Sequence, residues 1–90
     1  MQLFPSYPNP FNQSTLIPFQ LAASELAQIT IYNLAGQRVR QLLDDRLNAG
    51  KYTVSWNGLD DMGRPLASGV YLCRLQVGQQ ERTNKMLLVR

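Results

Sequence analysis

The residues that most often carry catalysis are scarce in this chain. Its 90 residues contain no histidine and a single cysteine, Cys73. This count excludes a histidine-based triad, a metal site of histidine and cysteine, and an internal disulfide. Cys73 alternates with Tyr71 and Leu75 in an apolar stretch, which predicts a small buried side chain rather than a nucleophile.

Two pairs of adjacent aspartates could do chemistry as carboxylates. Asp44–Asp45 and Asp60–Asp61 could ligate calcium or act together in hydrolysis. Neither pair has the alternating spacing of a calcium loop, and adjacent aspartates in turns usually accept hydrogen bonds from the backbone. We therefore expect no catalytic residue, no metal and no cofactor, and a domain that is not an enzyme.

The aromatic residues admit two interpretations. Tyr52, Trp56 and Tyr71 could form a flat platform that binds a sugar. Aromatic residues that alternate along a strand more often pack in a core, with Trp56 the natural centre. The predicted core consists of Ile29, Ile31, Val54, Trp56, Tyr71 and Leu75.

Composition and charge exclude further classes of protein. The chain is 44% hydrophobic and 17% charged, and its net charge of +3 comes from nine Lys and Arg residues against six Asp and Glu. The basic residues are scattered, so nucleic acid is not an expected partner. The longest apolar runs, at 70–73 and 86–89, fall far short of the roughly 20 residues that span a membrane. Residues 1–5 lack the pattern of an export signal, which we expect to lie elsewhere if the protein is exported.

The size and breakers of the chain predict one small β domain behind a linker. Residues 1–14 contain Pro5, Pro8 and Pro10, which cannot donate ladder hydrogen bonds and favour an extended linker that carries a Pro-Asn-Pro motif. Tyr7 and Phe11 could anchor this linker to the domain that follows, residues 15–90.

Alternating apolar residues predict the strands of that domain. They indicate strands at 15–21, 27–32, 37–43, 51–56, 70–77 and 82–89, with Pro18 favouring an edge position for the first. Loops are expected at 44–50 and 57–69, and short helices are possible only at 24–27 or 41–45. Turn signals every eight to twelve residues favour an all-β antiparallel sandwich.

Two segments share one turn signature. Asn33–Gly36 and Asp60–Gly63 each begin with an Asx residue and end with glycine. This spacing predicts a type I turn followed by a left-handed glycine. The glycines are accordingly expected to serve the backbone rather than a ligand.

A set of short motifs in fixed order extends over almost the whole chain. The matching segments are Tyr7–Asn12, Ile31–Val39, Gly50, Trp56–Gly58, Asp60, Gly63–Pro65, Ser68–Tyr71 and Lys85–Arg90. Together they resemble the type A C-terminal sorting domain of the type IX (Por) secretion system. The central segments also resemble the immunoglobulin-like domain of the flagellar hook-capping protein. The ending at Arg90 favours the sorting domain, whereas Gln13 departs from it, because the family usually continues with another proline there.

The resemblance implies an immunoglobulin-like β-sandwich of about seven strands that acts as an address and performs no chemistry. Such domains lie at the C-terminus of large secreted enzymes and adhesins. They direct the protein that precedes them, the cargo, through the periplasm to the type IX translocon. A sortase-like enzyme often removes the domain at the cell surface while it attaches the cargo to lipopolysaccharide. The implied recognition residues are Pro8, Asn9, Pro10, Gly69, Tyr71, Lys85 and Arg90.

Within the last motif, Lys85 and Arg90 are expected to place charge at the rim of the sandwich, where it is free to serve a partner. The alternative function is a structural or carbohydrate-binding immunoglobulin-like appendage of a multidomain secreted enzyme. That function would need only the sandwich and an exposed aromatic patch.

Overall fold

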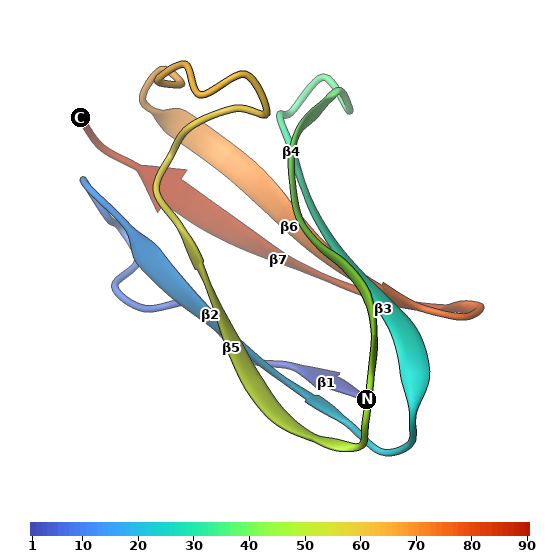
Figure 1. Ribbon diagram of the computed structural model, residues 1–90. Helices are drawn as coiled ribbons and strands as arrows, with labels where there is room; N and C mark the ends of the chain where they lie inside the picture. The colour runs from blue at the N-terminus through green and yellow to red at the C-terminus, as the bar shows by residue number, and fades with distance from the viewer.

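The computed structural model describes residues 1–90 as seven strands without a helix (Figure 1). The strands are β1 (Gln2–Leu3), β2 (Thr15–Leu21), β3 (Glu25–Tyr32), β4 (Arg38–Leu47), β5 (Gly50–Trp56), β6 (Gly69–Val77) and β7 (Gln80–Leu88). They form two antiparallel sheets, in the orders β1-β2-β5 and β4-β3-β6-β7. The predicted all-β sandwich is confirmed.

The core lies between the two sheets and follows the alternation of the sequence. Every second residue is buried along β2, from Ala27 to Ile31 in β3 and from Tyr71 to Val77 in β6. Trp56 is fully buried, with its ring centroid 5.5 Å from that of Phe11 and 5.4 Å from that of Tyr71. Of the six predicted core residues, five are buried, and Val54 is half-buried against the same cluster.

The polar stretch after residue 43 is strand rather than loop. β4 continues through Asp44 to Leu47, where it pairs with the first half of β3, and Gln28 donates a hydrogen bond to Asp44 Oδ1 at 3.2 Å. The predicted loop at 44–50 was therefore wrong, and the two possible helices at 24–27 and 41–45 fall in β3 and β4. Pairing across the sheet outweighs the weak local preference of a polar segment.

Pro18 is tolerated in the middle strand of its sheet. β2 lies between β1 and β5, so the predicted edge position is wrong. The carbonyl of Pro18 accepts a hydrogen bond from Phe4 N at 3.0 Å, so the nitrogen of Pro18 also faces the β1 side. β1 pairs with β2 only at Gln20 and Phe19, so no ladder bond is lost.

Residues 1–14, predicted as a linker, lie along the sandwich. β1 pairs with β2, and Tyr7 exchanges two backbone hydrogen bonds with Leu16. Phe11 is buried, whereas Tyr7 is 53% exposed. The Tyr7–Pro8 and Asn9–Pro10 peptide bonds are cis. This path brings residues 9–11 to the edge of β7.

Candidate functional site

Asn9 joins the Pro-Asn-Pro motif to the end of the chain. Its Oδ1 accepts a hydrogen bond from Leu87 N at 2.9 Å, and its Nδ2 donates to Lys85 O at 3.1 Å. The Asn9 side-chain amide thus makes the hydrogen bonds to β7 that the backbone of a neighbouring strand would make. Thr15 Oγ1 holds the same turn from the other side by donating to Pro8 O at 2.8 Å.

Phe11 continues this pairing and reaches the core. Its N–H donates to Leu87 O at 3.0 Å, and its carbonyl accepts from Val89 N at 2.8 Å. Its side chain packs on Trp56, which donates Nε1–H to Leu59 O at 3.0 Å. Phe11 thereby connects the surface motif to the core.

The central motif pairs directly with the terminal one. Gly69 lies opposite Leu88, and Tyr71 lies opposite Met86 in the β6–β7 ladder. The Tyr71 hydroxyl donates to Ala67 O at 2.7 Å and fixes the loop that enters β6. The three predicted recognition motifs therefore form one contiguous group, which we call the motif cluster: Pro8–Phe11, Gly69–Tyr71 and Lys85–Arg90.

Arg90 differs from its prediction as a free charge at the rim. Its guanidinium donates from Nη2 to Gly58 O at 2.7 Å and from Nε to Leu66 O, and its backbone N–H donates to Ser68 Oγ at 2.8 Å. The side chain thus joins the start and the end of the long loop between β5 and β6. Its main role is structural, and the sequence could not indicate this because both carbonyls lie more than twenty positions away.

The groups of the motif cluster that remain available to a partner are few. The Lys85 side chain is exposed and makes no hydrogen bond or ion pair within the domain, and Val89 is 47% exposed. Pro8 and Pro10 are exposed beside them. A pocket at this position is lined by Pro8, Pro10, Phe11, Asn12, Val89 and Arg90.

The second aspartate pair lies at the β4 edge of the four-stranded sheet, opposite the β7 edge that Asn9 covers. Asp61 N donates to Val39 O at 2.9 Å, and Asp61 Oδ1 accepts from Gln41 N at 2.9 Å, so Asp61 pairs with β4 much as Asn9 pairs with β7. Arg38 lies 3.2 Å from Asp61 Oδ2. The backbone N–H of Gln41, followed by Arg38, holds the pKa of Asp61 below its usual value.

Asp60 performs the turn role that its sequence predicts. Its Oδ1 accepts from the N–H groups of Met62 and Arg64, each at 2.9 Å, and the N–H of Arg64 is the main reason that the pKa of Asp60 is lowered. Gly63 N donates to Asp60 O at 3.0 Å with φ of +78°, and Gly36 repeats this geometry after Asn33 with φ of +80°. The carboxylates of Asp60 and Asp61 thus accept hydrogen bonds from backbone N–H groups and pair with arginine side chains. The structure contains no group of three potential metal ligands.

The structure favours the core interpretation of the aromatic residues over the alternative of a sugar platform. Trp56 is fully buried and Tyr71 is 7% exposed, while Tyr52 stacks on Phe19 with 5.4 Å between ring centroids. These aromatic residues face the core, so they cannot present a flat surface to a glycan. Cys73 is also buried, and burial raises the pKa of its thiol to about 12, so it carries no thiolate at neutral pH.

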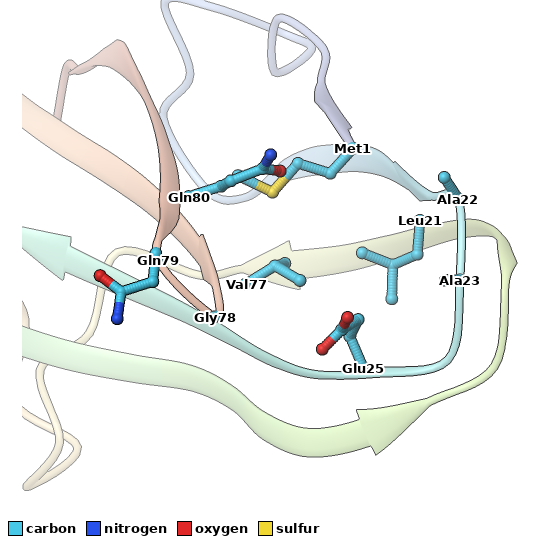
Figure 2. Close-up of a pocket in the computed structure, with 9 residues that line it drawn as sticks. All are labelled: Met1, Leu21, Ala22, Ala23, Glu25, Val77, Gly78, Gln79 and Gln80. Carbon is cyan, nitrogen blue, oxygen red and sulfur yellow. The ribbon is translucent and has the colours of Figure 1, made fainter.

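A second pocket lies at the other end of the sandwich, where Met1 meets the β6–β7 turn (Figure 2). Its lining combines apolar side chains such as Leu21 and Val77 with Gln79, Gln80 and one carboxylate, Glu25. A lone carboxylate without a second acid or base does not form a hydrolytic pair. The motif cluster is the better candidate for function.

The sequence matches the profile of a known domain family. The profile of the FlgD Ig-like domain matches residues 9–81. The chain belongs to the FlgD Ig-like domain family. This family assignment agrees with the immunoglobulin-like sandwich that the resemblance implied, and the seven strands of the structure fit it.

Two solved structures share this Ig-like fold. One is PorZ, described as an essential bacterial surface component of the type-IX secretion system of Porphyromonas gingivalis; it is 20% identical, with a TM-score of 0.66 over 98% of this chain and 11% of its own. The other is dimeric latent PorU from the same organism, 19% identical, with a TM-score of 0.76 over 97% of this chain and 9% of its own. The Ig-like domain thus spans about a tenth of each protein.

No curated protein matches the sequence. The Ig-like domain has no helix that could cross a membrane.

Proposed function

We propose that this Ig-like domain is a non-catalytic C-terminal targeting domain that directs an N-terminal cargo through the type IX secretion system to the cell surface. Its partners would be the type IX translocon and a sortase-like enzyme. The domain would be recognised in the periplasm after export across the inner membrane.

The observation that carries this proposal is the assembly of the motif cluster. Pro8–Phe11, Gly69–Tyr71 and Lys85–Arg90 lie far apart in sequence, yet hydrogen bonds and ladder pairs bring them to one end of the domain. The fold shared with PorZ and PorU supports the same secretion context.

Within the cluster, different residues would serve assembly and contact. Some residues of the cluster make their contacts within the domain and would hold the surface in shape. These are Asn9, Tyr71 and Arg90, through their hydrogen bonds, and Phe11, through its burial. Lys85, Pro8, Pro10 and Val89 remain exposed and would touch the receptor. The free amine of Lys85 suits an acidic or carbonyl-lined receptor site.

The experiment is a reporter fusion. Residues 1–90 are placed behind an export signal and a reporter, and surface reporter is measured in a type IX-competent bacterium and in a translocon-deficient strain. Surface reporter that depends on the translocon supports the proposal. Equal surface reporter in the two strains would refute it.

A second function is favoured by one observation. The Asn9 amide and the Arg90 guanidinium make their hydrogen bonds within the domain, as they would in a purely structural Ig-like appendage. Such an appendage would tolerate Lys85→Ala, because that side chain is exposed and makes no hydrogen bond or ion pair within the domain. A loss of delivery in Lys85→Ala, with unchanged stability, therefore separates targeting from a structural role.

A further inference from the structure

The sandwich has four strand edges, and three of them are protected against pairing with another chain. β1 is only two residues long. Residues 9–11 cover β7 from Lys85 to its C-terminal end, and the remainder of β7 carries Glu81 and Arg82. β4 has two register shifts against β3 and is covered by Asp61 at its start. Short length, cover, charge and bulges are the usual means of preventing edge pairing.

Of these protections β5 has only one charged residue, Lys51. It lies at the edge of its sheet (Figure 1). It runs for seven residues in regular register with β2, without proline or bulge. Its other flank has no strand partner. β5 is thus the one long edge of the domain that is open to another strand.

The backbone groups that face outward from β5 can be identified from β2. Leu16 and Pro18 direct their backbone groups toward Tyr7 and Phe4, so they form the non-hydrogen-bonded pairs with Ser55 and Thr53. By alternation, the N–H and C=O groups of Lys51, Thr53 and Ser55 point away from the sheet. None of the backbone hydrogen bonds outside the ladders involves these three residues.

We propose that β5 pairs with β5 of a second copy of this chain, antiparallel and centred on Thr53, to join two three-stranded sheets into one of six strands. In this register Thr53 faces Thr53 of the second copy, and each Lys51 faces a Ser55. No like charges lie opposite each other, and threonine is a favourable cross-strand partner for threonine.

The other face of the paired strands is also self-complementary. Tyr52 and Val54 are half-buried at the edge of the core. In the proposed register each Tyr52 lies opposite Val54 of the second copy, a pair of aromatic and β-branched side chains that stabilises antiparallel strands. One seven-residue strand per copy makes a small interface, so the dimer should be weak and depend on concentration.

The test uses charge at the twofold position in the 90-residue chain. Thr53→Lys and Thr53→Glu each place like charges opposite each other, and each should weaken dimerisation by about tenfold or more in sedimentation equilibrium. An equimolar mixture of the two variants should dimerise at least as well as the parent. Thr83→Lys, an exposed threonine on the β7 edge, is the matched control and should leave dimerisation unchanged.

Cross-linking provides a second measurement that does not depend on charge. A hydrogen-bonded antiparallel pair places its Cα atoms about 5.5 Å apart, within the range of a disulfide, so oxidised Thr53→Cys should form a covalent dimer. Lys51→Cys should not, because its two copies would lie about 13 Å apart at four residues of separation. A parent chain that stays monomeric at millimolar concentration, or a Thr53→Cys variant that forms no more dimer than Lys51→Cys, would overturn the proposal.

Discussion

The guanidinium of Arg90 and the carbonyl oxygen of Gly58 lie 2.7 Å apart at the end of the sandwich. Gly58 has φ of +74°, and a Cβ at this position would lie 2.8 Å from Arg90 Nη2. The positive φ favours glycine at this position, and a Cβ here would displace the Arg90 guanidinium. Arg90 thus connects the two ends of the loop between β5 and β6.

This contact predicts that Arg90 stabilises the fold. Arg90→Ala removes two charge-assisted hydrogen bonds to backbone carbonyls and should lower the free energy of unfolding by about 1–3 kcal/mol. Lys85→Ala, whose side chain has no such bond, should change it by less than about 0.5 kcal/mol. Urea denaturation of both variants checks the difference, and equal effects would contradict the structural role of Arg90.

Asn9 should matter for stability in the same way. Asn9→Ala removes one accepted and one donated hydrogen bond to β7 and should cost about 1–2 kcal/mol of unfolding free energy. Asn12→Ala is the matched control, because Asn12 is exposed and should have little effect. Hydrogen exchange at Leu87 gives a local readout, since its amide should lose protection in Asn9→Ala alone.

Trp56 should be the most sensitive core position. Trp56→Ala empties the space between Phe11 and Tyr71 and should lower the free energy of unfolding by about 3–5 kcal/mol. Met62→Ala, at a side chain 77% exposed, should stay within about 0.5 kcal/mol of the parent. A loss below about 1 kcal/mol in Trp56→Ala would contradict its placement at the centre of the core.

The lowered pKa of Asp61 predicts a loss of stability in acid. A carboxyl whose pKa is lower in the folded than in the unfolded chain stabilises the fold fully above its unfolded pKa, here 3.8, and loses this effect as the pH falls through the folded pKa. Asp61→Asn keeps an acceptor for Gln41 N but no longer titrates. The free energy of unfolding, measured by urea denaturation from neutral pH to below about pH 4, should therefore fall less steeply for Asp61→Asn than for the parent.

Local pattern was enough to predict much of the core and two of the turns. The alternation of apolar residues predicted β2 with its observed bounds, and it placed Trp56 in the interior. The spacing of Asn33 and Gly36 predicted their turn, because an Asx side chain and a left-handed glycine act within four residues. Such features depend on neighbours in sequence.

Features that depend on distant partners were missed. Asp44–Leu47 is strand because β3 lies beside it, and the polar sequence alone indicated a loop. Arg90 resembles any terminal charge until the fold brings Gly58 and Leu66 to it. For the motif cluster, the resemblance supplied the residues, but only the fold separates those that build the surface from Lys85, which is free.

The most direct test of the targeting proposal is surface delivery of the reporter by the Lys85→Ala fusion in a type IX-competent bacterium, compared with the parent fusion and with Arg82→Ala, another exposed cation on β7. All three domains should unfold at nearly the same urea concentration. The proposal predicts that the amount of reporter at the surface falls strongly for Lys85→Ala alone. The undelivered reporter should accumulate in the periplasm. Delivery of Lys85→Ala at the level of the parent would contradict the assignment of Lys85 as a contact for the secretion machinery.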